Sequence, residues 1–571
     1  MVRRAAAFLA VGTPRSNDIG HTYTLTGTFA GLCILLAYVV LTVTALDDNS
    51  ATFDEANHLV RGLYALGKGD FLLNREHPPL VNLLQAMPSH FLQRPVMPTA
   101  QASDYPFFGY AQTVVWNAGN DAFAMIRSGR LVTIALTVLL GALVYHWSLQ
   151  VHGRGGALVS LASLVSTPMI LAHGALITTD IGLAVSMLLY WYCVWRFLHR
   201  PTALAGALAG FALGIALASK HLAWLNVPVT LLVLLLVHRK GALLIRRVSL
   251  PRDLMPALIL TSLWLFEALL VVWACYGFKL GAIPGTELTI PAPDYWSGLL
   301  GGWSNLEQGR LFFLDNVTST EGWLSYFPRA FVYKTPWPIL VLMCFACMAI
   351  VTNQNKRDAA LHAIAVGILL FAGLVLVKRV NLGLRYWLFL YPFLALFLGS
   401  VAHLPRFRWW VTPLLGILAY SSVRVAPDYL AYFNPWIPDS EKHTYLVDSN
   451  LDWGQGLPAL ARYQQIHAVY DLNFGYFGTA DYAAYGIQAR ALPSFLLPAW
   501  RGPIHTQLDG MVAVSATLLQ GLYVKPRDFY APLRESVPVM TLGGGAILIF
   551  NCRRFAENRA CNAEIDDSAP Q

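Results

Sequence analysis

The chain has few charged residues for its length. Of its 571 residues only 13% are Asp, Glu, Lys or Arg, whereas 56% are hydrophobic, and soluble proteins carry about 25% charged residues. Many apolar runs approach the ~20 residues that cross the hydrocarbon core of a bilayer. The composition therefore excludes an ordinary soluble enzyme and predicts a polytopic helical membrane protein. Basic cytoplasmic loops explain the net charge of +8, so it requires no nucleic acid.

The sequence also lacks the short motifs of several large enzyme classes. It contains no P-loop, no HExxH metal-binding helix and no GxSxG nucleophile turn. It has no low-complexity segment and no internal repeat, although repeats are common in secondary transporters. No cleavable signal peptide is evident, so we expect the first apolar run, 27–46, to remain as a membrane anchor.

Cysteine is scarce and gives little information about function. Of the seven cysteines, five lie in apolar runs, where the CxxC spacing of Cys344 and Cys347 indicates packing rather than chemistry. Cys552 and Cys561 lie in a polar tail. We expect them to be able to form a disulfide only if that tail lies outside the cytoplasm.

The apolar runs predict about eleven membrane spans in an all-α domain over residues 1–426. These spans cover roughly 25–46, 128–150, 156–175, 181–198, 202–218, 222–238, 256–277, 331–351, 359–377, 386–402 and 409–425. If the N-terminus is inside, the basic residues of the short loops at 154, 196–200, 239–252, 356–357 and 406–408 also fall inside. This agreement with the positive-inside rule supports the count and the orientation.

The same count predicts an extracytoplasmic α/β domain over 427–571. Strands are predicted at 445–448, 469–474, 511–518 and 546–551, with a helix at 457–465. The loop 47–127, the turn at 178–180 and the loop 278–330 also fall outside. So do Lys220, Arg379 and Arg385, which oppose the positive-inside trend and therefore need another reason to be there.

The first outer loop contains a concentrated set of polar residues. Thr52 and Glu55 have the spacing of a capping box, which predicts a helix that begins near Phe53. Asp54, His58 and Arg61 then share one face of this helix. Pro78 and Pro79 predict the start of a second helix with an apolar stripe, so we expect two amphipathic helices on the membrane surface.

Each charged candidate also has a simpler structural explanation. Glu55 can close a capping box, Asp180 can cap a helix, and the outer cations can reach the membrane interface by extending their side chains. Together, however, outward carboxylates beside outward cations suit group transfer from a phosphate-linked donor, because a carboxylate can act as general base and cations can stabilise a departing phosphate. The segment 448–454 looks like a calcium loop, but its Gly is misplaced and residue 459 is Ala instead of Glu.

Six segments in order resemble the GT-C superfamily of membrane glycosyltransferases that use polyprenyl-phosphate sugars. The chain is similar to the protein O-mannosyltransferases and the lipid A aminoarabinose transferases, and resembles most the bacterial phospholipid-carrier-dependent glycosyltransferases. The segments that carry the resemblance are Phe53–His58, Asn74–Leu80, Thr178–Asp180, Gly214–His221, Glu321–Trp323 with Lys334–Pro336, and Asp448–Gln455.

The resemblance implies the roles of individual residues. Asp54 corresponds to the catalytic base, and Asp180 to a second acidic position that orients the acceptor or a metal. Donor-binding roles fall to Glu55, His58, His77, Lys220, Arg379 and Arg385, and His77 stands where the aminoarabinose transferases carry a Lys. The resemblance leaves open whether a divalent metal takes part. It implies an inverting transferase in a bacterial inner membrane, acting on a protein, lipid or glycan acceptor among membrane lipids.

Two other classes of function remain as alternatives. A secondary transporter would place its ionisable residues near the midplane of the membrane in matching repeats, whereas here they cluster at one face. A non-catalytic relative would keep the fold and bind the lipid-linked glycan without turning it over. Turnover of the donor, as distinct from binding, separates this last class from an enzyme.

Overall fold

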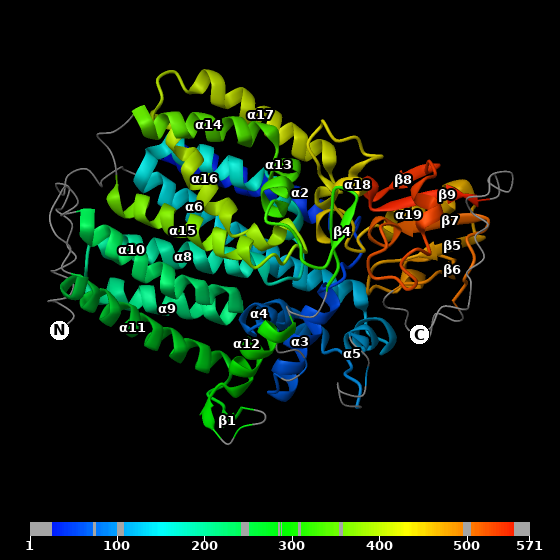
Figure 1. Ribbon diagram of the computed structural model, residues 1–571, viewed down its shortest axis with the longest axis horizontal. Coiled ribbons are helices and arrows are strands. Elements are labelled where there is room, and N and C mark those ends of the chain that lie inside the picture. Colours follow the sequence, from blue (N-terminus) through cyan, green and yellow to red (C-terminus); the bar gives the residue numbers. More distant parts are fainter. Residues whose placement is uncertain are drawn as a thin grey trace.

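The structure is a bundle of long helices that run side by side, with a small sheet at one end (Figure 1). This computed structural model describes residues 25–71, 73, 76–99, 105, 108–240, 250–283, 286, 288–305, 310–352, 358–494 and 504–552. Most of the protein is helical. The catalytic candidates lie between the bundle and the sheet.

The bundle is formed by apolar helices from most of the chain. Their bounds are α2 Leu25–Thr44, α6 Ala122–Val165, α7 Pro168–His173, α8 Asp180–His199, α9 Ala203–Ser219, α10 Asn226–Lys240, α11 Leu250–Cys275, α13 Tyr326–Lys334, α14 Trp337–Thr352, α15 Ala359–Val377, α16 Leu390–Leu398 and α17 Arg408–Val425. Helix α8 packs on α9, α9 on α11, and α10 on α15, while α2 and α16 both pack on α6. The core contains large buried side chains, among them Trp147, Trp191 and Trp264.

Helix α6 is two antiparallel legs rather than one rod. Its 44 residues break at Gly153, where φ is +71°, a conformation that favours glycine. Across the break the Oγ atoms of Ser148 and Ser160 lie 2.8 Å apart. Gly141 on the first leg faces Leu161 on the second. The two legs occupy the positions of the predicted spans 128–150 and 156–175.

The predicted number of eleven spans is not confirmed. By length and apolar composition, five described helices can cross a membrane, namely α2, α6, α8, α11 and α15. The count becomes six if α13 and α14, which meet at 109°, form one broken span. Shorter apolar helices cover Ala203–Ser219, His221–Val237 and Leu390–His403. These helices support an integral membrane protein, and the larger count stays a prediction.

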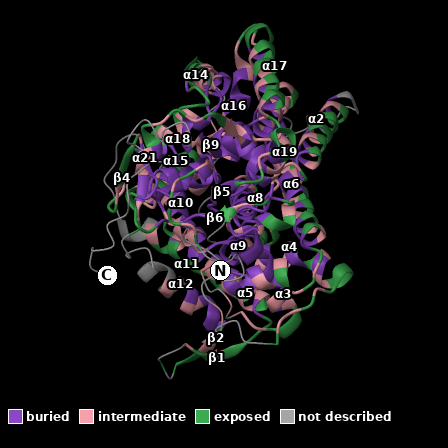
Figure 2. Ribbon diagram, turned by 90° about the vertical axis from the view of Figure 1, so that its right-hand side faces the viewer, coloured by how far each residue is buried: buried purple, intermediate pink, exposed green. Residues whose placement is uncertain are grey.

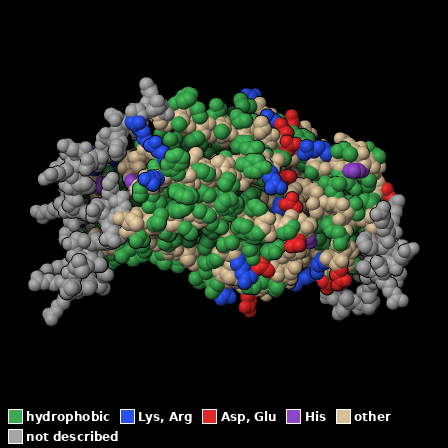
Figure 3. Space-filling model, turned by 90° about the horizontal axis from the view of Figure 1, so that it is seen from above, with side chains coloured by type: hydrophobic (Ala, Val, Ile, Leu, Met, Phe, Trp, Pro, Cys, Tyr) green, Lys and Arg blue, Asp and Glu red, His purple; other side chains and the backbone are tan. Residues whose placement is uncertain are grey.

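The outer surface of the bundle is apolar, as a lipid-facing surface requires. Apolar side chains cover the middle of the face in Figure 3, and charged side chains gather toward the end that carries the sheet. Exposed residues follow α2 and α17 at the periphery (Figure 2), where Phe29 is 69% and Trp409 77% exposed. A soluble protein seldom exposes apolar patches of this extent.

The first loop folds into the short helices that the sequence predicts. Helix α3, Glu55–Lys68, packs on α4, Leu80–Pro88. The contact is so close that a Cβ atom on Gly62 would lie 2.1 Å from the Asn82 carbonyl oxygen. Loop residues continue into η1 Ser89–Gln93, α5 Gly109–Gln112 and η3 Thr113–Asn117. The exposed Phe91 and Leu92 give η1 an apolar surface, consistent with the predicted amphipathic character.

The C-terminal region contains a five-stranded mixed sheet. The strand order is β6-β5-β7-β9-β8, with β5 parallel to β6 and β7, and β9 antiparallel to β7 and β8. The bounds are β5 Leu472–Gly475, β6 Arg490–Ala491, β7 Met511–Ser515, β8 Met540–Leu542 and β9 Ile547–Asn551, and helix α19 covers Leu457–His467. Short elements complete this region, namely η8 Tyr429–Ala431, α18 Lys442–Tyr445, η9 Asp448–Asn450, η10 Tyr482–Tyr485, α20 Ala516–Leu519, α21 Ala531–Arg534 and η12 Gly543–Gly545.

Several of the elements predicted for this region are present, whereas a separate α/β domain over 427–571 stays a prediction. The expected helix at 457–465 and the strands near 469–474, 511–518 and 546–551 are present. The strand expected at 445–448 is wrong, because α18 ends at Tyr445 and the backbone turns to a φ of +57° at Asp448. A strand cannot continue through that conformation. Cys552 is buried, whereas Cys561 lies outside the described residues, so their pairing stays a prediction.

The remaining described elements are two hairpins, one helix and three short 3-10 segments. Two short antiparallel hairpins pair β1 Leu280–Ala282 with β2 Thr289–Pro291, and β3 Phe312–Leu314 with β4 Val317–Ser319. Helix α12 spans Pro293–Asn305, and the 3-10 segments η4 His221–Leu225, η6 Leu384–Trp387 and η7 Gly399–His403 begin or continue bundle helices. Of these, η4 and η6 matter most, because each is next to a candidate cation.

Candidate functional site

A cavity of about 880 Å³ lies where the helical bundle meets the C-terminal sheet region. Five of the eight residues that the sequence singled out line it, namely Asp54, His58, His77, Lys220 and Arg385. The wall opposite them comes from the C-terminal region and includes Asp448, Trp453, Phe477 and residues 521–527. The cavity is therefore built from segments at both ends of the chain, which the fold brings together.

Asp54 immediately precedes helix α3 and faces the cavity. Its Oδ2 accepts a hydrogen bond from Arg385 Nη1 at 3.0 Å, and its side chain remains 20% exposed. The neighbouring Phe53 is fixed from the C-terminal region on both sides of its backbone. Its N–H donates to the Trp453 carbonyl at 2.8 Å, and its own carbonyl accepts from Thr479 Oγ1 at 2.8 Å. The Phe53 ring also stacks on another cavity-lining residue, Phe477.

Asp180 begins helix α8 and lies behind the cavity wall rather than on it. Its side chain is 2% exposed, and Oδ1 accepts from Lys220 Nζ at 2.5 Å. Its Oδ2 makes no hydrogen bond, although Arg385 Nη1 lies 3.8 Å away. Asp180 therefore acts on the cavity through two cations that do line it. Lys220 reaches this position because α9 ends at Ser219 and the chain turns into η4.

Arg385 is the central cation of the site. It lies between Asp54 and Asp180, and its guanidinium rests 4.3 Å from the centroid of the Trp453 ring, a cation–π arrangement. Burial lowers the pKa of Arg385, but Asp54 and Asp180 outweigh that effect and raise the pKa above its usual value. Its Nε has no hydrogen-bond partner among the described residues. Arg385 is thus charged, partly unsatisfied and directed at the cavity.

The two predicted histidines lie side by side on the cavity wall. The His58 and His77 rings are 5.3 Å apart, and His58 Nδ1 lies 3.1 Å from Asn82 Oδ1. Arg61 holds the second ring in place, because its Nη2 donates to the His77 carbonyl. Burial lowers the pKa of His58 to about 4 and that of His77 well below its usual range. Both imidazoles are therefore neutral, and suit hydrogen bonding better than charge neutralisation.

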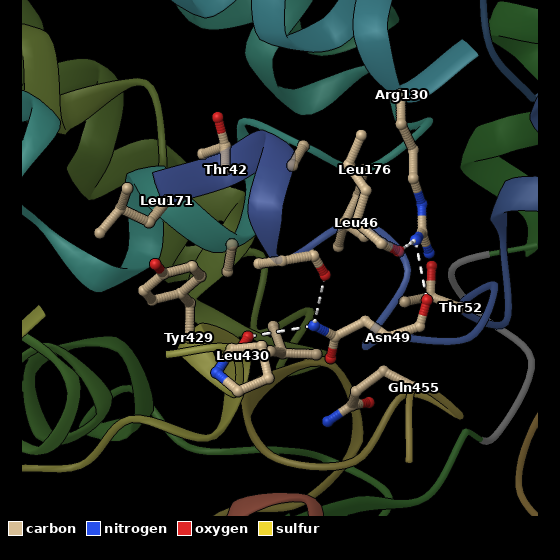
Figure 4. A pocket seen from close by; sticks show the side chains of 14 residues that line it. Thr42, Leu46, Asn49, Thr52, Arg130, Leu171, Leu176, Tyr429, Leu430 and Gln455 are labelled. Atoms are coloured by element: carbon tan, nitrogen blue, oxygen red, sulfur yellow. Dashed lines mark hydrogen bonds between the residues drawn. The ribbon is translucent and has the colours of Figure 1, made fainter. Parts of the chain in front are cut away.

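Glu55 does not line the cavity. Its fully buried carboxylate receives Arg130 Nε and Nη2 at 2.9 and 2.7 Å, and also accepts the backbone N–H groups of Thr52 and Ile177. Burial raises the pKa of Glu55, but Arg130 and these hydrogen bonds hold it below its usual value. The remaining donor capacity of Arg130 binds the carbonyl oxygens of Leu46 and Asn49 (Figure 4). Arg130 also donates to the carbonyl oxygen of Ser50. Of the expected capping box, the bond from the Thr52 N–H is present.

Arg379 does not line the cavity either. It follows the end of α15, is exposed, and does not contribute to the cavity wall. Arg385, six residues later, is at the cavity because η6 turns this part of the chain toward Asp54. Glu55 and Arg379 are thus the two predicted site residues that the structure does not bring to the site.

The C-terminal region supplies cavity residues that sequence reasoning did not assign. They are Asp448, Trp453, Tyr523 and the cations Lys525 and Arg527, with Arg310 from the loop before β3. Asp448 and Trp453 belong to the segment 448–455, which carries part of the resemblance, but the sequence assigned neither residue a role. Residues 523–527 follow no periodic pattern and carry no motif, so the sequence gives no signal for them.

The side chains of the site determine whether it can hold a divalent metal ion. Among the described residues, no three His, Cys, Asp or Glu side chains converge as a metal ion would need. Asp54 and Asp180 are each engaged by Arg385 or Lys220. The described residues therefore do not form a metal site.

Two proteins of known structure give weak matches to the chain. The S. cerevisiae protein O-mannosyltransferase Pmt1-Pmt2 complex bound to the sugar donor is 17% identical, with a TM-score of 0.34 over 47% of this chain and 36% of that chain. ArnT from Cupriavidus metallidurans, in the apo state and bound to undecaprenyl phosphate, is 13% identical, with a TM-score of 0.30 over 92% of this chain and 98% of that chain. Likenesses at these TM-scores are too weak to assign a fold. The chain spans about a third of the length of the yeast protein.

The family comparison is more specific. None of the curated proteins matches the chain. Residues 106–266 match the family described as dolichyl-phosphate-mannose-protein mannosyltransferase. The matched segment contains Asp180 and Lys220, which form an ion pair at the cavity wall, and ends before Arg385. Over these residues the chain is similar to a family of GT-C glycosyltransferases, in agreement with the resemblance that its six motifs indicate.

Proposed function

We propose that this protein is an inverting GT-C glycosyltransferase. It moves a sugar from a polyprenyl-phosphate carrier to an acceptor hydroxyl at the outer membrane surface. The observation that carries the proposal is the cavity lined by Asp54, Arg385 and Lys220, with Asp180 directly behind the two cations. A carboxylate beside anion-binding cations is what transfer from a phosphate-linked sugar requires. The family match over residues 106–266 supports the same class of reaction.

Asp54 is the general base in this mechanism. Its carboxylate takes the proton of the acceptor hydroxyl while the acceptor oxygen attacks the anomeric carbon from the face opposite the phosphate. The new carbon–oxygen bond forms as the bond to the phosphate oxygen breaks, and the phosphate leaves with the electron pair. Attack from the opposite face inverts the anomeric carbon. Asp54 has to exchange Arg385 for the acceptor hydroxyl, and its 20% exposure makes that contact accessible.

Lys220 and Arg385 stabilise the negative charge that develops on the leaving phosphate. Both line the cavity, and Asp180 orients both from behind. Because both cations are already in position, they can stabilise the leaving phosphate without the reorientation that water molecules would have to undergo. We assign this role to Arg385 in place of Arg379, which is exposed and away from the cavity. The neutral His58 and His77 supply hydrogen bonds to the donor.

The remaining parts of the proposal concern place and substrates. We place the cavity and the α/β region 427–571 on the extracytoplasmic side of a bacterial inner membrane, in line with the basic Arg196 and Arg200 at the end of α8 that is opposite to Asp180. The donor carries a hexose or a pentose, and the acceptor is a protein, a lipid or a glycan. The apolar surface of the bundle supplies the contact with membrane lipids.

The test is the carrier-linked sugar that accumulates in cells without this protein. Lipid mass spectrometry of the deletion strain, complemented with wild type or with Asp54→Asn, measures that accumulation. We expect one polyprenyl-phosphate sugar to build up and only the wild-type copy to relieve it, which also identifies the sugar. Relief by Asp54→Asn at equal protein level would contradict the mechanism and favour a binding protein that does not turn the donor over.

A further inference from the structure

The cavity contains more cations than the proposed chemistry uses. Its basic lining residues are Lys220, Arg310, Arg385, Lys525 and Arg527, and its acidic lining residues are Asp54, Glu76 and Asp448. Lys220 and Arg385 are already engaged, because they pair with Asp54 and Asp180. The proposed donor brings one phosphate, which these two cations bind. The other three cations therefore need a different explanation.

We call Arg310, Lys525 and Arg527 the outer cations. All three are exposed, whereas the side chains of Lys220 and Arg385 are only 8% and 13% exposed. Within the part of the chain that the structure describes, no outer cation forms an ion pair or a side-chain hydrogen bond. Like charges on one cavity wall repel each other and concentrate ligands of opposite sign. Three separately solvated surface residues would not converge on one cavity in this way.

The outer cations come from two segments that pack together. Lys525 and Arg527 follow α20, and Arg310 precedes β3. Phe313 of β3 and Leu522 belong to one buried cluster. The turn between β3 and β4 also donates two backbone hydrogen bonds to α18, at 3.0 and 2.7 Å. The fold therefore holds all three cations on the same wall of the cavity.

A row of aromatic rings connects the outer cations to Asp54. The Phe53 ring stacks on Phe477 with their centroids 4.9 Å apart, and Phe477 stacks on Tyr523, also at 4.9 Å. Asp54 directly follows Phe53, and Lys525 comes two residues after Tyr523. The two stacking contacts hold the proposed base and the outer cations in a fixed relation. One compact acceptor can therefore reach both, with its reacting hydroxyl at Asp54 and a negative group at the outer cations.

The two groups of cations differ in their position relative to the bundle. Lys220 and Arg385 follow the bundle helices α9 and α15. The apolar chain of a lipid carrier stays in the hydrocarbon, so its phosphate is held at this end of the bundle. Lys525 and Arg527 belong to the C-terminal region, which extends beyond the end of the bundle (Figure 1). A ligand of the outer cations therefore approaches from the aqueous side and is distinct from the donor.

We propose that the outer cations form an acceptor subsite for an acidic glycan, a saccharide that carries carboxylate or phosphate groups and enters from the aqueous side. This inference deepens the proposed function and rests on it, because an acceptor is needed only if the protein transfers a sugar. The planar guanidinium groups of Arg310 and Arg527 can each bind an anionic group through two parallel hydrogen bonds, and Lys525 adds a third charge. The glycan hydroxyl that lies at Asp54 receives the sugar.

Other classes of acceptor fit this wall less well. A glycan has hydroxyl and acidic groups on the same or adjacent rings, which matches the short span of the aromatic row. An extended peptide is commonly bound along an open strand edge. The edge strand β6 is already occupied, because the Ala491 carbonyl accepts the N–H of His505 at 2.8 Å. A lipid headgroup would stay near the bundle, where the cations are paired with carboxylates.

The experiment measures binding of labelled trisaccharides to the full-length protein in nanodiscs of zwitterionic lipid. The acidic probe is trigalacturonate, and the neutral probe is maltotriose with the same label. Dissociation constants are measured for wild type, for Lys525→Gln combined with Arg527→Gln, and for Lys525→Arg combined with Arg527→Lys, which keeps both charges. Arg490→Gln, which removes an exposed cation of the same region that pairs with Asp471, is the matched control. Binding of undecaprenyl phosphate to the same samples reports on the donor site.

We expect wild type to bind the acidic probe about tenfold more tightly than the neutral one, with a preference that falls as salt is added. The double glutamine variant should reduce this preference about fivefold, whereas the charge-preserving variant and Arg490→Gln should keep it. All of these proteins should bind undecaprenyl phosphate equally well. Arg310→Gln, on a different segment, provides a second test if the double glutamine variant folds poorly, and should reduce the preference about twofold.

Four results would overturn the inference. Equal affinity of wild type for the two trisaccharides is the first, and a preference that survives both the double glutamine variant and Arg310→Gln is the second. The third is equal affinity for a blocked peptide of three glutamates and one serine, which would indicate a peptide acceptor. The fourth is competition by phosphatidic acid in the nanodisc, which would indicate a lipid headgroup. Failure of wild type to bind undecaprenyl phosphate would instead contradict the donor site and the proposed function, so the two failures are distinguishable.

Discussion

Asp54 and Glu55 are neighbours in the sequence, yet each forms an ion pair of a different kind. The carboxylate of Glu55 is closed off, because Arg130 and two backbone N–H groups use its capacity and water is excluded. The Asp54–Arg385 pair borders an 880 Å³ cavity, and Arg385 Nε has no hydrogen-bond partner. A saturated buried pair holds a fold together, whereas an open and incompletely satisfied pair can exchange one partner for a substrate.

The largest expected effect is on turnover by Asp54→Asn. Removal of the general base should lower kcat by about 10²–10⁴-fold, with little change in thermal stability, because Asn keeps the shape of the side chain. Turnover of a purified donor measures the loss, and a melting curve establishes that the variant is folded. Asp47→Asn, an exposed acid that pairs with Arg127, is the control and should keep wild-type turnover. Near-normal turnover by Asp54→Asn would contradict the role of Asp54 as general base, and Asp54 would then not differ from Glu55 in this respect.

Glu55→Gln should show the opposite pattern. It leaves Arg130 charged and buried without its partner, which destabilises a protein by about 3–5 kcal/mol. The expected result is a lower melting temperature and less folded protein, with turnover per folded molecule close to that of wild type. Loss of turnover at unchanged stability would assign Glu55 to the chemistry after all.

Arg385 and Arg379 offer a smaller and finer comparison. Arg385→Gln removes a charged hydrogen-bond donor from the cavity and should raise the KM for the donor by about 10–100-fold. Arg379→Gln changes an exposed residue of the same charge on the same loop, and should leave KM within about twofold of wild type. Equal effects of the two substitutions would mean that the loop rearranges when the donor binds.

The smallest expected effect is the pH dependence of stability at Glu55. Because its folded-state pKa is lowered, the stabilisation is present above the unfolded value of 4.5 and is lost as the pH falls through the folded value. The difference in melting temperature between wild type and Glu55→Gln should therefore shrink as the pH is lowered from about 6 to about 3. A difference that stays constant over this range would show that Glu55 does not titrate with the pair.

Sequence reasoning brought together the residues of the candidate site better than it separated their roles. That Asp54, Lys220 and Arg385 lie at the same end of the bundle could be predicted, because it follows from periodicity and span order. The roles of Asp54 and Glu55 could not be separated, since that depends on Arg130, which is 75 residues from Glu55 in the sequence. Arg385 lies at the cavity and Arg379 does not because η6 turns the chain between them. The amino-acid composition of this loop does not indicate that turn.

The fold, too, could be predicted only where it follows from local sequence patterns and not where it depends on tertiary contacts. Strands β7 and β9 are apolar runs, so the sequence predicted them, and α19 has the expected helical pattern. The apolar run before Asp448 predicted a strand, but the φ of +57° at Asp448 depends on tertiary contacts with Tyr523 and Thr517. The number of spans could not be fixed, because several apolar helices are too short to pass a length criterion.

The contacts that hold Phe53 have a consequence for the synthesis of this protein. The hydrogen bond from Thr479 to Phe53 joins residues 426 positions apart, and Trp453 and Phe477 hold the same residue. A ribosome therefore completes every apolar helix of the bundle before the segment that fixes the Asp54 loop has been synthesised. A nascent or prematurely terminated chain is inserted but inert, and cannot consume the donor until the last part of the polypeptide has folded onto the first.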